Sequence, residues 1–338
     1  MRIRSKAPLR IGFAGGGTDV PPYPEREGGC VLNATINRYA YGSLTPRDDT
    51  QITIESLDFG ISVNFDIQED LPYDGKLDLI RAAIKKLIPP DSRGFDLIVH
   101  SEAPPGTGLG SSSTVMVALV GLLKEFANLP LTDYEIADMA YVIERKDLGI
   151  KGGLQDQYAA TFGGFNFIEF LADRVIVTPL KIHLDVINEL NHNFTLVYTG
   201  TTRMSANIIE DQVNRFTRGE EETLAGLRQL KEISIEMKNA LLRRNLNDFG
   251  SLLHEAWIAK KRNSSKITNP HIEEMYETAR KAGALGGKIS GAGGGGYLML
   301  YCEFEKKHKV AEAMKRMGGT ISDFSFSRYG LQTWRIND

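Results

Sequence analysis

The chain has 338 residues, of which 42% are hydrophobic, and a formal net charge of −3 at pH 7. This length can bury a large core and predicts two domains, whereas the near balance of charges argues against a basic face for nucleic acid. Two cysteines, Cys30 and Cys302, are too few for a disulfide framework and are expected to be buried thiols. No stretch reaches the ~20 apolar residues of a membrane span, and no apolar run follows the start of the chain. The sequence therefore predicts a cytoplasmic protein with no membrane or nucleic-acid partner.

The first half of the chain is expected to be mostly β-structure. A short helix is predicted at residues 76–87. Thr132 and Glu135 have the spacing of a capping box, which predicts a helix that reaches Asp147. Turn-bounded runs rich in β-branched residues predict strands at 31–44, 51–65, 95–101, 175–179 and 194–199.

After residue 200 the pattern changes to helix. The break near residues 180–195 predicts a boundary between an N-terminal domain, 1–185, and a C-terminal domain, 186–338. Two more strands are expected, at 297–303 and 324–334. The predicted helices cover 205–218, 220–244, 247–261, 270–282 and 307–317.

A glycine-rich segment, Pro-Pro-Gly-Thr-Gly-Leu-Gly-Ser-Ser-Ser at residues 104–113, has the pattern of an anion site. It follows the apolar run 95–101 and opens an apolar helical stretch at 113–123. A strand, a glycine loop and a helix start in this order direct backbone N–H groups and the positive end of a helix dipole at one point, which favours phosphate. An ordinary glycine turn before a serine-capped helix would give the same local pattern.

Two better-known phosphate motifs are excluded. A P-loop requires Ser or Thr after Gly-Lys, but here the Gly-Lys pairs precede Leu77 and Ile289. The glycines of 291–296 match the spacing of the dinucleotide fingerprint, yet the segment after them reads as a strand where the fingerprint requires a helix.

Three separate segments, at residues 7–19, 104–113 and 288–296, together resemble the signature motifs of the GHMP kinases. This family comprises galactokinase, homoserine kinase, mevalonate kinase and phosphomevalonate kinase, and the resemblance extends from Arg4 to about Tyr301. It implies an α+β fold, in which an N-terminal ribosomal-protein-S5-like domain and a C-terminal ferredoxin-like domain enclose the active site. It also implies ATP as the phosphoryl donor and Mg²⁺ as the accompanying ion.

The resemblance assigns nucleotide binding to the second motif. Ser112 aligns with a serine that helps to hold Mg²⁺ in this family, and Glu144 occupies the place of the accompanying carboxylate. A solvated position for Glu144, paired with Arg145 or Asp147, is the alternative. The expected nucleotide-binding residues are Pro105, Gly106, Thr107, Gly108, Leu109, Gly110, Ser111, Ser112 and Ser113.

The segment Gly-Gly-Leu-Gln-Asp-Gln at 152–157 resembles the catalytic motif of the sugar kinases. The resemblance implies that Asp156 accepts the proton of the acceptor hydroxyl or orients that hydroxyl. It also places the basic Arg10 of the first motif beside Asp156, where a cation would stabilise the migrating charge. From local sequence alone, an Asx turn for Asp156 and a surface position for Arg10 are the alternatives.

The first motif departs from that of the galactokinases. Where they have Gly-Glu-His-Thr-Asp, this chain has Gly-Gly-Gly-Thr-Asp at 15–19, which argues against galactose. The longer run Phe-Ala-Gly-Gly-Gly-Thr-Asp resembles the D-glycero-D-manno-heptose 7-phosphate kinases, which form a 1,7-bisphosphate for nucleotide-activated heptose and surface polysaccharides. Lys151 and Arg203 either bind the 7-phosphate or face solvent. The expected substrate residues are Gly16, Gly17, Thr18, Asp19, Lys151, Arg203 and Gly293.

Three other readings remain. A fucose- or hexose-type sugar 1-kinase would share the same chemistry. A catalytically silent sensor is disfavoured because Arg10, Ser112, Glu144 and Asp156 all have the residue types that catalysis needs. An RNA-binding module is disfavoured by the absence of a basic face. The expected partners are ATP and a sugar or sugar phosphate, and a homodimer is left open.

Overall fold

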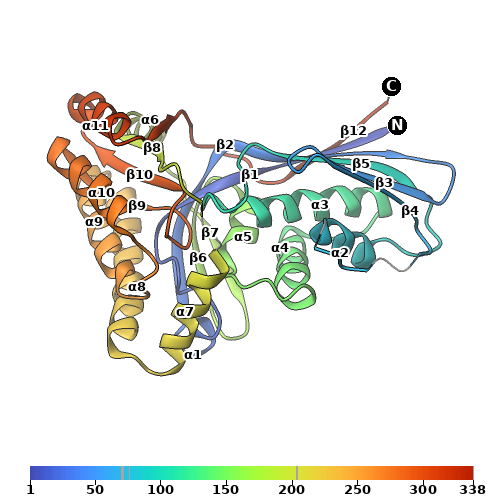
Figure 1. The fold of residues 1–338 in the computed structure, drawn as a ribbon, viewed down its shortest axis with the longest axis horizontal. Helices are drawn as coiled ribbons and strands as arrows, with labels where there is room; N and C mark the ends of the chain where they lie inside the picture. Colours follow the sequence, from blue (N-terminus) through green and yellow to red (C-terminus); the bar gives the residue numbers. More distant parts are fainter. Residues whose placement is uncertain (70–71, 76, 203–204, 338) are drawn as a thin grey trace.

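A computed structural model of the protein describes residues 1–69, 72–75, 77–202 and 205–337. These residues form two β-sheets with their helices, arranged side by side (Figure 1). The strands of the large sheet are β1 (Arg2–Ala14), β2 (Gly29–Pro46), β3 (Gln51–Ser56), β4 (Ile61–Asp66), β5 (Phe95–Ser101), β6 (Phe165–Phe170), β7 (Val175–Pro179) and β12 (Gln332–Ile336). Their main order is β12-β1-β2-β5-β3-β4, and β6 and β7 continue from the other end of β2.

The expected strand at 51–65 is a hairpin instead. Residues 51–56 and 61–66 pair antiparallel as β3 and β4, and a turn at 57–60 separates them. Gly60 in this turn has φ of 61°, a left-handed conformation that glycine adopts without steric cost. The β-branched residues on both sides of the turn explain why the sequence reads as one strand.

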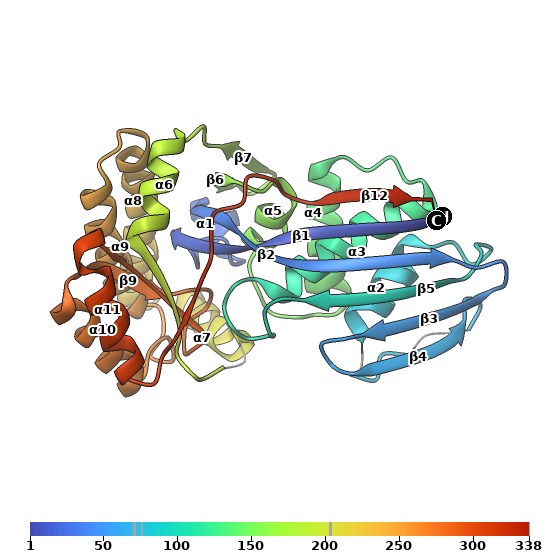
Figure 2. The same ribbon diagram turned by 90° about the horizontal axis from the view of Figure 1, so that it is seen from above.

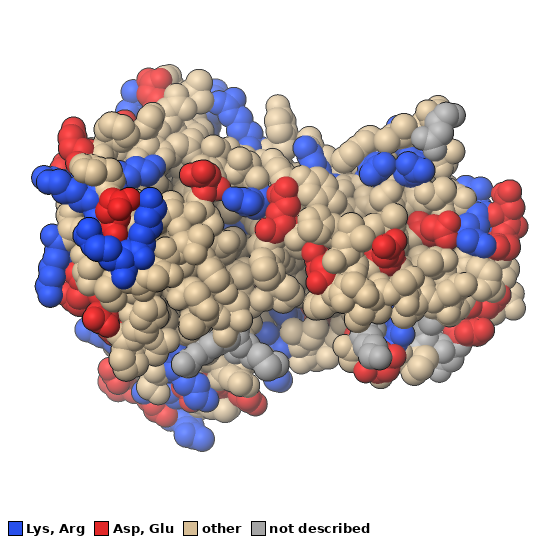
Figure 3. All heavy atoms as spheres, turned by 45° about the horizontal axis from the view of Figure 1, so that its top comes forward, with Lys and Arg blue, Asp and Glu red and all other residues tan. Residues whose placement is uncertain are grey.

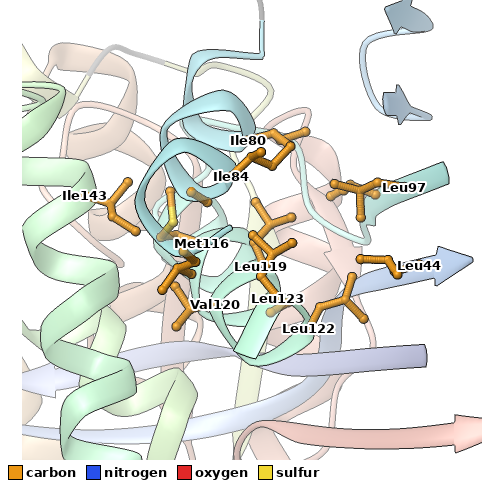
Figure 4. Close-up of a cluster of buried hydrophobic side chains, with 14 of the residues drawn as sticks. Leu44, Ile80, Ile84, Leu97, Met116, Leu119, Val120, Leu122, Leu123 and Ile143 are labelled. Atoms are coloured by element: carbon orange, nitrogen blue, oxygen red, sulfur yellow. The ribbon is translucent and has the colours of Figure 1, made fainter. Parts of the chain in front are cut away.

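Four helices cover one face of the large sheet (Figures 1 and 2). They are α2 (Asp78–Leu87), α3 (Ser111–Ala127), α4 (Asp133–Tyr141) and α5 (Gln155–Phe162). Figure 4 shows that Leu119 and Leu122 of α3 point into a cluster with Leu44 of β2, Leu97 of β5 and Ile84 of α2. This burial of apolar side chains fixes α3, and therefore the glycine loop before it, against the sheet.

The capping box before α4 is confirmed. The Glu135 carboxylate accepts a bond of 2.8 Å from the Thr132 N–H, and the Glu135 N–H donates to the Thr132 hydroxyl at 3.4 Å. The helix reaches Asp147 as expected, but its last part is the π-helical segment η1 (Val142–Asp147). π-Helical turns occur frequently at functional sites, and this one contains Glu144.

The small sheet has the order β11-β8-β10-β9, with all neighbours antiparallel. Its strands are β8 (Phe194–Tyr198), β9 (Ala284–Ile289), β10 (Tyr297–Cys302) and β11 (Thr320–Ser322). The remaining helices are α1 (Tyr23–Glu27), α6 (Leu184–Asn193), α7 (Ser205–Thr217), α8 (Glu221–Leu242), α9 (Leu246–Lys261), α10 (Pro270–Ala282) and α11 (Phe304–Arg316). In the described part of the chain, no helix is long and apolar enough to cross a bilayer.

The last expected strand, 324–334, is wrong over most of its length. Phe326 forms a single bridge with Ile36, and the chain pairs regularly only in β12, which runs antiparallel to the start of β1. Phe324 and Phe326 pack into a core cluster, so their apolar spacing reflects packing and not a strand. The C-terminal strand thus returns to the large sheet, beside the N-terminus (Figure 1). The division near residue 185 stays a prediction.

Positive and negative side chains are intermixed over the face shown in Figure 3. Lys and Arg cluster toward one end of this face, where they alternate with Asp and Glu, and most of the surface between the two ends is uncharged (Figure 3). On this face the described residues form no continuous basic surface of the kind that binds nucleic acid.

Candidate active site

One cleft is lined by residues of all three sequence motifs. The first wall of the cleft comprises its lining residues from 10 to 156, and the second wall those from 205 to 295. Glycines, short polar side chains and a few cations dominate it, as phosphate sites require. The lining residues are Arg10, Gly16, Gly17, Asp19, Val20, Gly106, Gly108, Gly110, Ser111, Ser112, Ser113, Arg145, Ile150, Lys151, Gly152, Gly153, Gln155, Asp156, Ser205, Ile208, Ile209, Gln212, Lys260, Gly291, Ala292, Gly293 and Gly295.

The glycine loop takes a backbone form that other residues rarely adopt. Gly106, Gly108 and Gly110 have φ of 79°, 83° and 78°. Helix α3 begins immediately after Gly110, so the free N–H groups of its first turn lie beside these glycines. The loop and the helix start therefore have the backbone geometry that the predicted anion site requires, and binding of an anion there stays a prediction.

Not every residue of this loop presents its side chain to the cleft. The Thr107 hydroxyl donates to the Pro104 carbonyl at 2.8 Å, and Leu109 is buried in a core cluster. The Ser111 hydroxyl donates to the Ala103 carbonyl at 2.7 Å. Thr107 and Leu109 thus hold the loop in place with their side chains, and nucleotide binding by these two residues stays a prediction. Pro105 does not line the cleft either.

The structure pairs Asp156 with Arg10. Two nitrogens of the Arg10 guanidinium lie 2.8 and 2.6 Å from Oδ1 of Asp156, and a third contact joins Arg10 Nη1 to the Gly108 carbonyl at 2.7 Å. Arg10 is only 3% exposed, which excludes the alternative of a surface arginine. Asp156 lies in the first turn of α5 and lines the cleft, so its carboxylate can reach a bound hydroxyl while Arg10 fixes its position.

Glu144 is fully buried, which overturns the alternative of a solvated side chain. Its carboxylate accepts bonds from the Ser112 hydroxyl at 2.9 Å and from Nε2 of Gln157 at 2.6 Å, while Arg145 is 4.0 Å away. In the described residues no group of three or more His, Cys, Asp or Glu could hold a metal. A cation at the Ser112–Glu144 pair would therefore need further oxygen ligands from phosphate groups or water.

The first motif contributes Asp19. The side chain is 1% exposed and accepts bonds from the N–H groups of Gly17 and Gln155 at 3.0 and 3.1 Å. Burial, followed by repulsion from Asp156, raises the pKa of Asp19, against the effect of the bond from Gly17. Gly153 must be glycine because a Cβ there would lie 2.0 Å from Oδ2 of Asp19. Asp19 is therefore a buried carboxylate that backbone N–H groups fix in place among the lining residues of the cleft.

Thr18 does not line the cleft, which corrects its expected role as a substrate residue. It is fully buried, and its hydroxyl donates to the carbonyls of Gly15 and Cys30 and accepts the Cys30 N–H. These bonds tie the first motif to β2. Thr18 therefore shapes the loop that carries Gly16 and Gly17, which do line the cleft.

The third motif packs directly against the second. The Ser290 hydroxyl donates to the Gly108 carbonyl at 2.9 Å. A Cβ on Gly108 would lie 2.3 Å from the backbone carbonyl oxygen of Ser290. The Tyr297 N–H donates to the Thr107 carbonyl at 3.1 Å. Gly293 lines the cleft as expected. The motif is therefore both the structural support of the glycine loop and a part of the site surface.

The structure describes one of the two basic residues that are expected to bind the substrate phosphate. Lys151 is exposed at the edge of the cleft and is one of its lining residues. Arg203 lies outside the described residues. The sequence did not single out Arg145, Gln155 or Gln212, which also line the cleft.

Sequence reasoning also missed Lys260 of α9. It is 4% exposed, lines the cleft, and donates to the Gly291 carbonyl. Burial, and then repulsion from Arg10, lower its pKa to about 8. Lys288 of β9 is also buried and donates to the Gly12 carbonyl at 3.0 Å. In the sequence, Lys260 stands beside Lys261 in an amphipathic helix, and nothing there separates a buried lysine from a solvated one.

Several known proteins are similar to this chain in sequence and in fold. Family models for the GHMP kinases N-terminal domain and the GHMP kinases C-terminal domain match residues 78–164 and 237–320. A D-glycero-alpha-D-manno-heptose 7-phosphate kinase from Campylobacter jejuni is 40% identical over 338 residues, 99% of each chain. The crystal structure of a D-glycero-D-manno-heptose 1-phosphate kinase from Bacteroides thetaiotaomicron is 36% identical, with a TM-score of 0.83 over 99% of this chain and 100% of that chain. An L-fucokinase/L-fucose-1-P guanylyltransferase from Bacteroides fragilis is 29% identical over 88% of this chain and 34% of that protein.

Proposed function

The chain belongs to the GHMP kinase family, and from this we propose that it transfers the γ-phosphoryl group of ATP to the anomeric hydroxyl of D-glycero-D-manno-heptose 7-phosphate. The observation that carries the chemistry is the Arg10–Asp156 pair, held at 2.6 Å beside a glycine loop and a helix start in one cleft. The choice of sugar is supported by 40% identity over 99% of the chain to a kinase of that sugar phosphate. The product would be the 1,7-bisphosphate, which serves nucleotide-activated heptose and surface polysaccharide synthesis.

The transfer needs positioning and charge stabilisation more than covalent chemistry. The anomeric oxygen attacks the γ-phosphorus in line, and its proton passes to the Asp156 carboxylate or to water oriented by it. As the new O–P bond forms, the bond from the γ-phosphorus to the bridging oxygen breaks, and ADP leaves with that electron pair. Arg10 holds Asp156 and stabilises the negative charge in the transition state.

Mg²⁺ would bind at Ser112 and Glu144. Their hydroxyl and carboxylate oxygens are hard ligands in contact at 2.9 Å, and Mg²⁺ in kinases takes one or two carboxylates together with phosphate oxygens. The ion would neutralise charge on the β- and γ-phosphates. We propose Lys151, the exposed cation at the cleft edge, as a contact for the 7-phosphate. A reaction that consumes ATP also favours a cytoplasmic location, and a homodimer stays a prediction.

The substrate is tested by ³¹P NMR of the purified protein with ATP, Mg²⁺ and one sugar per tube. The two heptose relatives differ in name by the position of the phosphate, 7 or 1, so both heptose phosphates are included with fucose, mannose and galactose. A new anomeric phosphate signal with the 7-phosphate alone is expected, and the Asp156→Asn variant should not give it. A signal with a free hexose or fucose, or with heptose 1-phosphate alone, would contradict the proposed substrate.

A further inference from the structure

Lys260 is a buried cation that the proposed reaction has not used. It lies near the end of α9, where its ammonium donates to the Gly291 carbonyl at the surface of the cleft. The next residue, Lys261, behaves differently, because it is partly exposed and pairs with Glu273 at 2.9 Å. Two adjacent lysines on one helix thus have opposite environments, and only the buried one lacks a carboxylate partner in the described chain.

The charges around Lys260 leave its ammonium uncompensated. Arg10 from β1 repels it, and it in turn repels Lys288 from β9. Asp19 and Asp156 attract it, but neither lies within ion-pair distance among the described residues. Asp156 is already paired with Arg10 at 2.6 Å, and the Asp19 oxygens already accept backbone N–H groups. An unpaired ammonium buried at a cleft surface is costly, which points to an anionic ligand that approaches it from the cleft.

The contacts of Lys260 lead to the site of phosphoryl transfer. Its acceptor residue, Gly291, packs against Gly108 so closely that a Cβ on Gly291 would lie 2.7 Å from the Gly108 Cα. The Gly108 carbonyl in turn accepts the bond of 2.7 Å from Arg10, the partner of Asp156. Gly108 and Gly291 therefore lie between Lys260, which belongs to the second wall, and the Arg10–Asp156 pair, which belongs to the first wall.

We propose that Lys260 binds the γ-phosphoryl group of ATP, as the cation that the second wall contributes to the transfer. The inference rests on the proposed function for its donor, ATP, but not on the identity of the sugar. During transfer the ammonium stays beside the phosphoryl oxygens as the bond to ADP breaks and the bond to the acceptor oxygen forms. Its contact is absent from ADP, which has no γ-phosphoryl group.

The test compares Lys260→Met, Lys260→Arg and the matched control Lys261→Met by calorimetry with ADP and with the non-hydrolysable analogue AMP-PNP. Lys260→Met should weaken AMP-PNP binding about tenfold or more and leave ADP binding unchanged, as expected for the loss of one charged hydrogen bond. Its kcat should fall about 100-fold, the effect of removing a preorganised charge at the transition state. Lys260→Arg should recover part of both losses, and Lys261→Met should resemble the wild type.

Other outcomes overturn the inference. Equal weakening of AMP-PNP and ADP would show a structural role, and no change in either nucleotide would remove Lys260 from the phosphoryl site. Weaker binding of the sugar phosphate alone would place Lys260 at the acceptor instead. The nucleotide comparison needs no sugar, so it remains decisive even if the NMR experiment disproves the heptose.

Discussion

The two walls of the cleft hold their charged side chains differently. In the first wall, Arg10 pairs with Asp156 at 2.6 Å, and the Glu144 carboxylate accepts two side-chain hydrogen bonds. In the second wall, the ammonium of Lys260 bonds to a carbonyl and to no other group among the described residues, and the same is true of the buried Lys288 behind the cleft. Burial lowers the pKa of both lysines. The first wall is therefore preorganised without a ligand, whereas Lys260 in the second wall carries a desolvation cost that an anion would offset.

The largest expected effect falls on the first wall. Asp156→Asn keeps the size of the side chain but removes the carboxylate that accepts or orients the proton, so kcat should fall ~10²–10⁴-fold. ATP binding should be nearly unchanged, because the glycine loop and α3 are intact. Steady-state kinetics and calorimetry measure the two quantities. Activity close to that of the wild type would remove Asp156 from catalysis.

Glu144→Gln tests the second charged group of the first wall, the Glu144 carboxylate that is proposed to bind Mg²⁺ with Ser112. The amide keeps the shape but loses the charge, and its NH₂ group faces a donor, either the Ser112 hydroxyl or Nε2 of Gln157. The Mg²⁺ concentration needed for half-maximal activity should rise about tenfold or more. Exposed Glu102, which bonds the Tyr39 N–H away from the cleft, gives the control Glu102→Gln. An unchanged Mg²⁺ requirement in Glu144→Gln would assign Glu144 a structural role only.

The first wall could be predicted from the sequence because its motifs are local. A glycine loop between a strand and an apolar helix has one favourable geometry, so the positions of Gly106, Gly108 and Ser112 follow from their neighbours in the chain. Arg10 and Asp156 are 146 residues apart, and only the family resemblance predicted their contact. The bonds from the Thr18 hydroxyl to the backbone of Cys30 could not be predicted, since the pairing of β1 with β2 brings Cys30 close to Thr18.

The second wall could not be predicted because its site residues depend on packing between distant segments. Lys260 reaches the cleft only because α9 packs on the small sheet and lies close to β1. In the sequence it is one of two adjacent lysines that close an amphipathic helix, and the usual expectation for such residues is solvent. The same limit explains the error at 324–334, where Phe324 and Phe326 pack between elements and do not form a ladder.

Gly108→Ala should disturb the contact between the walls. A Cβ there would lie 2.3 Å from the backbone carbonyl oxygen of Ser290, and φ of 83° is unfavourable for alanine. We expect a loss of about 2–4 kcal/mol in the free energy of unfolding together with weaker ATP binding. Gly60→Ala is the control, because it has a similar φ but nothing within 4 Å, and should cost only about 1 kcal/mol. Equal effects of the two substitutions would contradict a tight fit of the motifs.

The smallest expected effect tests whether the buried charge of Lys260 lowers the stability of the folded protein. The pKa of Lys260 is about 8 in the folded protein and 10.5 ordinarily, so the folded state holds this proton less tightly than the unfolded state. The penalty is full below pH 8, fades as the pH rises from 8 to 10.5, and is on the order of 3 kcal/mol. Lys260→Met removes this penalty but also loses the bond to the Gly291 carbonyl, and the loss of that bond offsets about 1 kcal/mol of the gain in stability.

Without ligand, Lys260→Met should therefore melt a few degrees above the wild type at pH 7, and this advantage should vanish by about pH 10.5. Lys261→Met, which removes a partly exposed lysine paired with Glu273, should show no such gain at pH 7. Melting curves at several pH values measure both differences. If Lys260→Met melts below the wild type by the same amount at every pH, the ammonium is not strained in the empty cleft. The contrast between a preorganised first wall and a costly second wall would then be wrong, because both walls would be satisfied without a ligand.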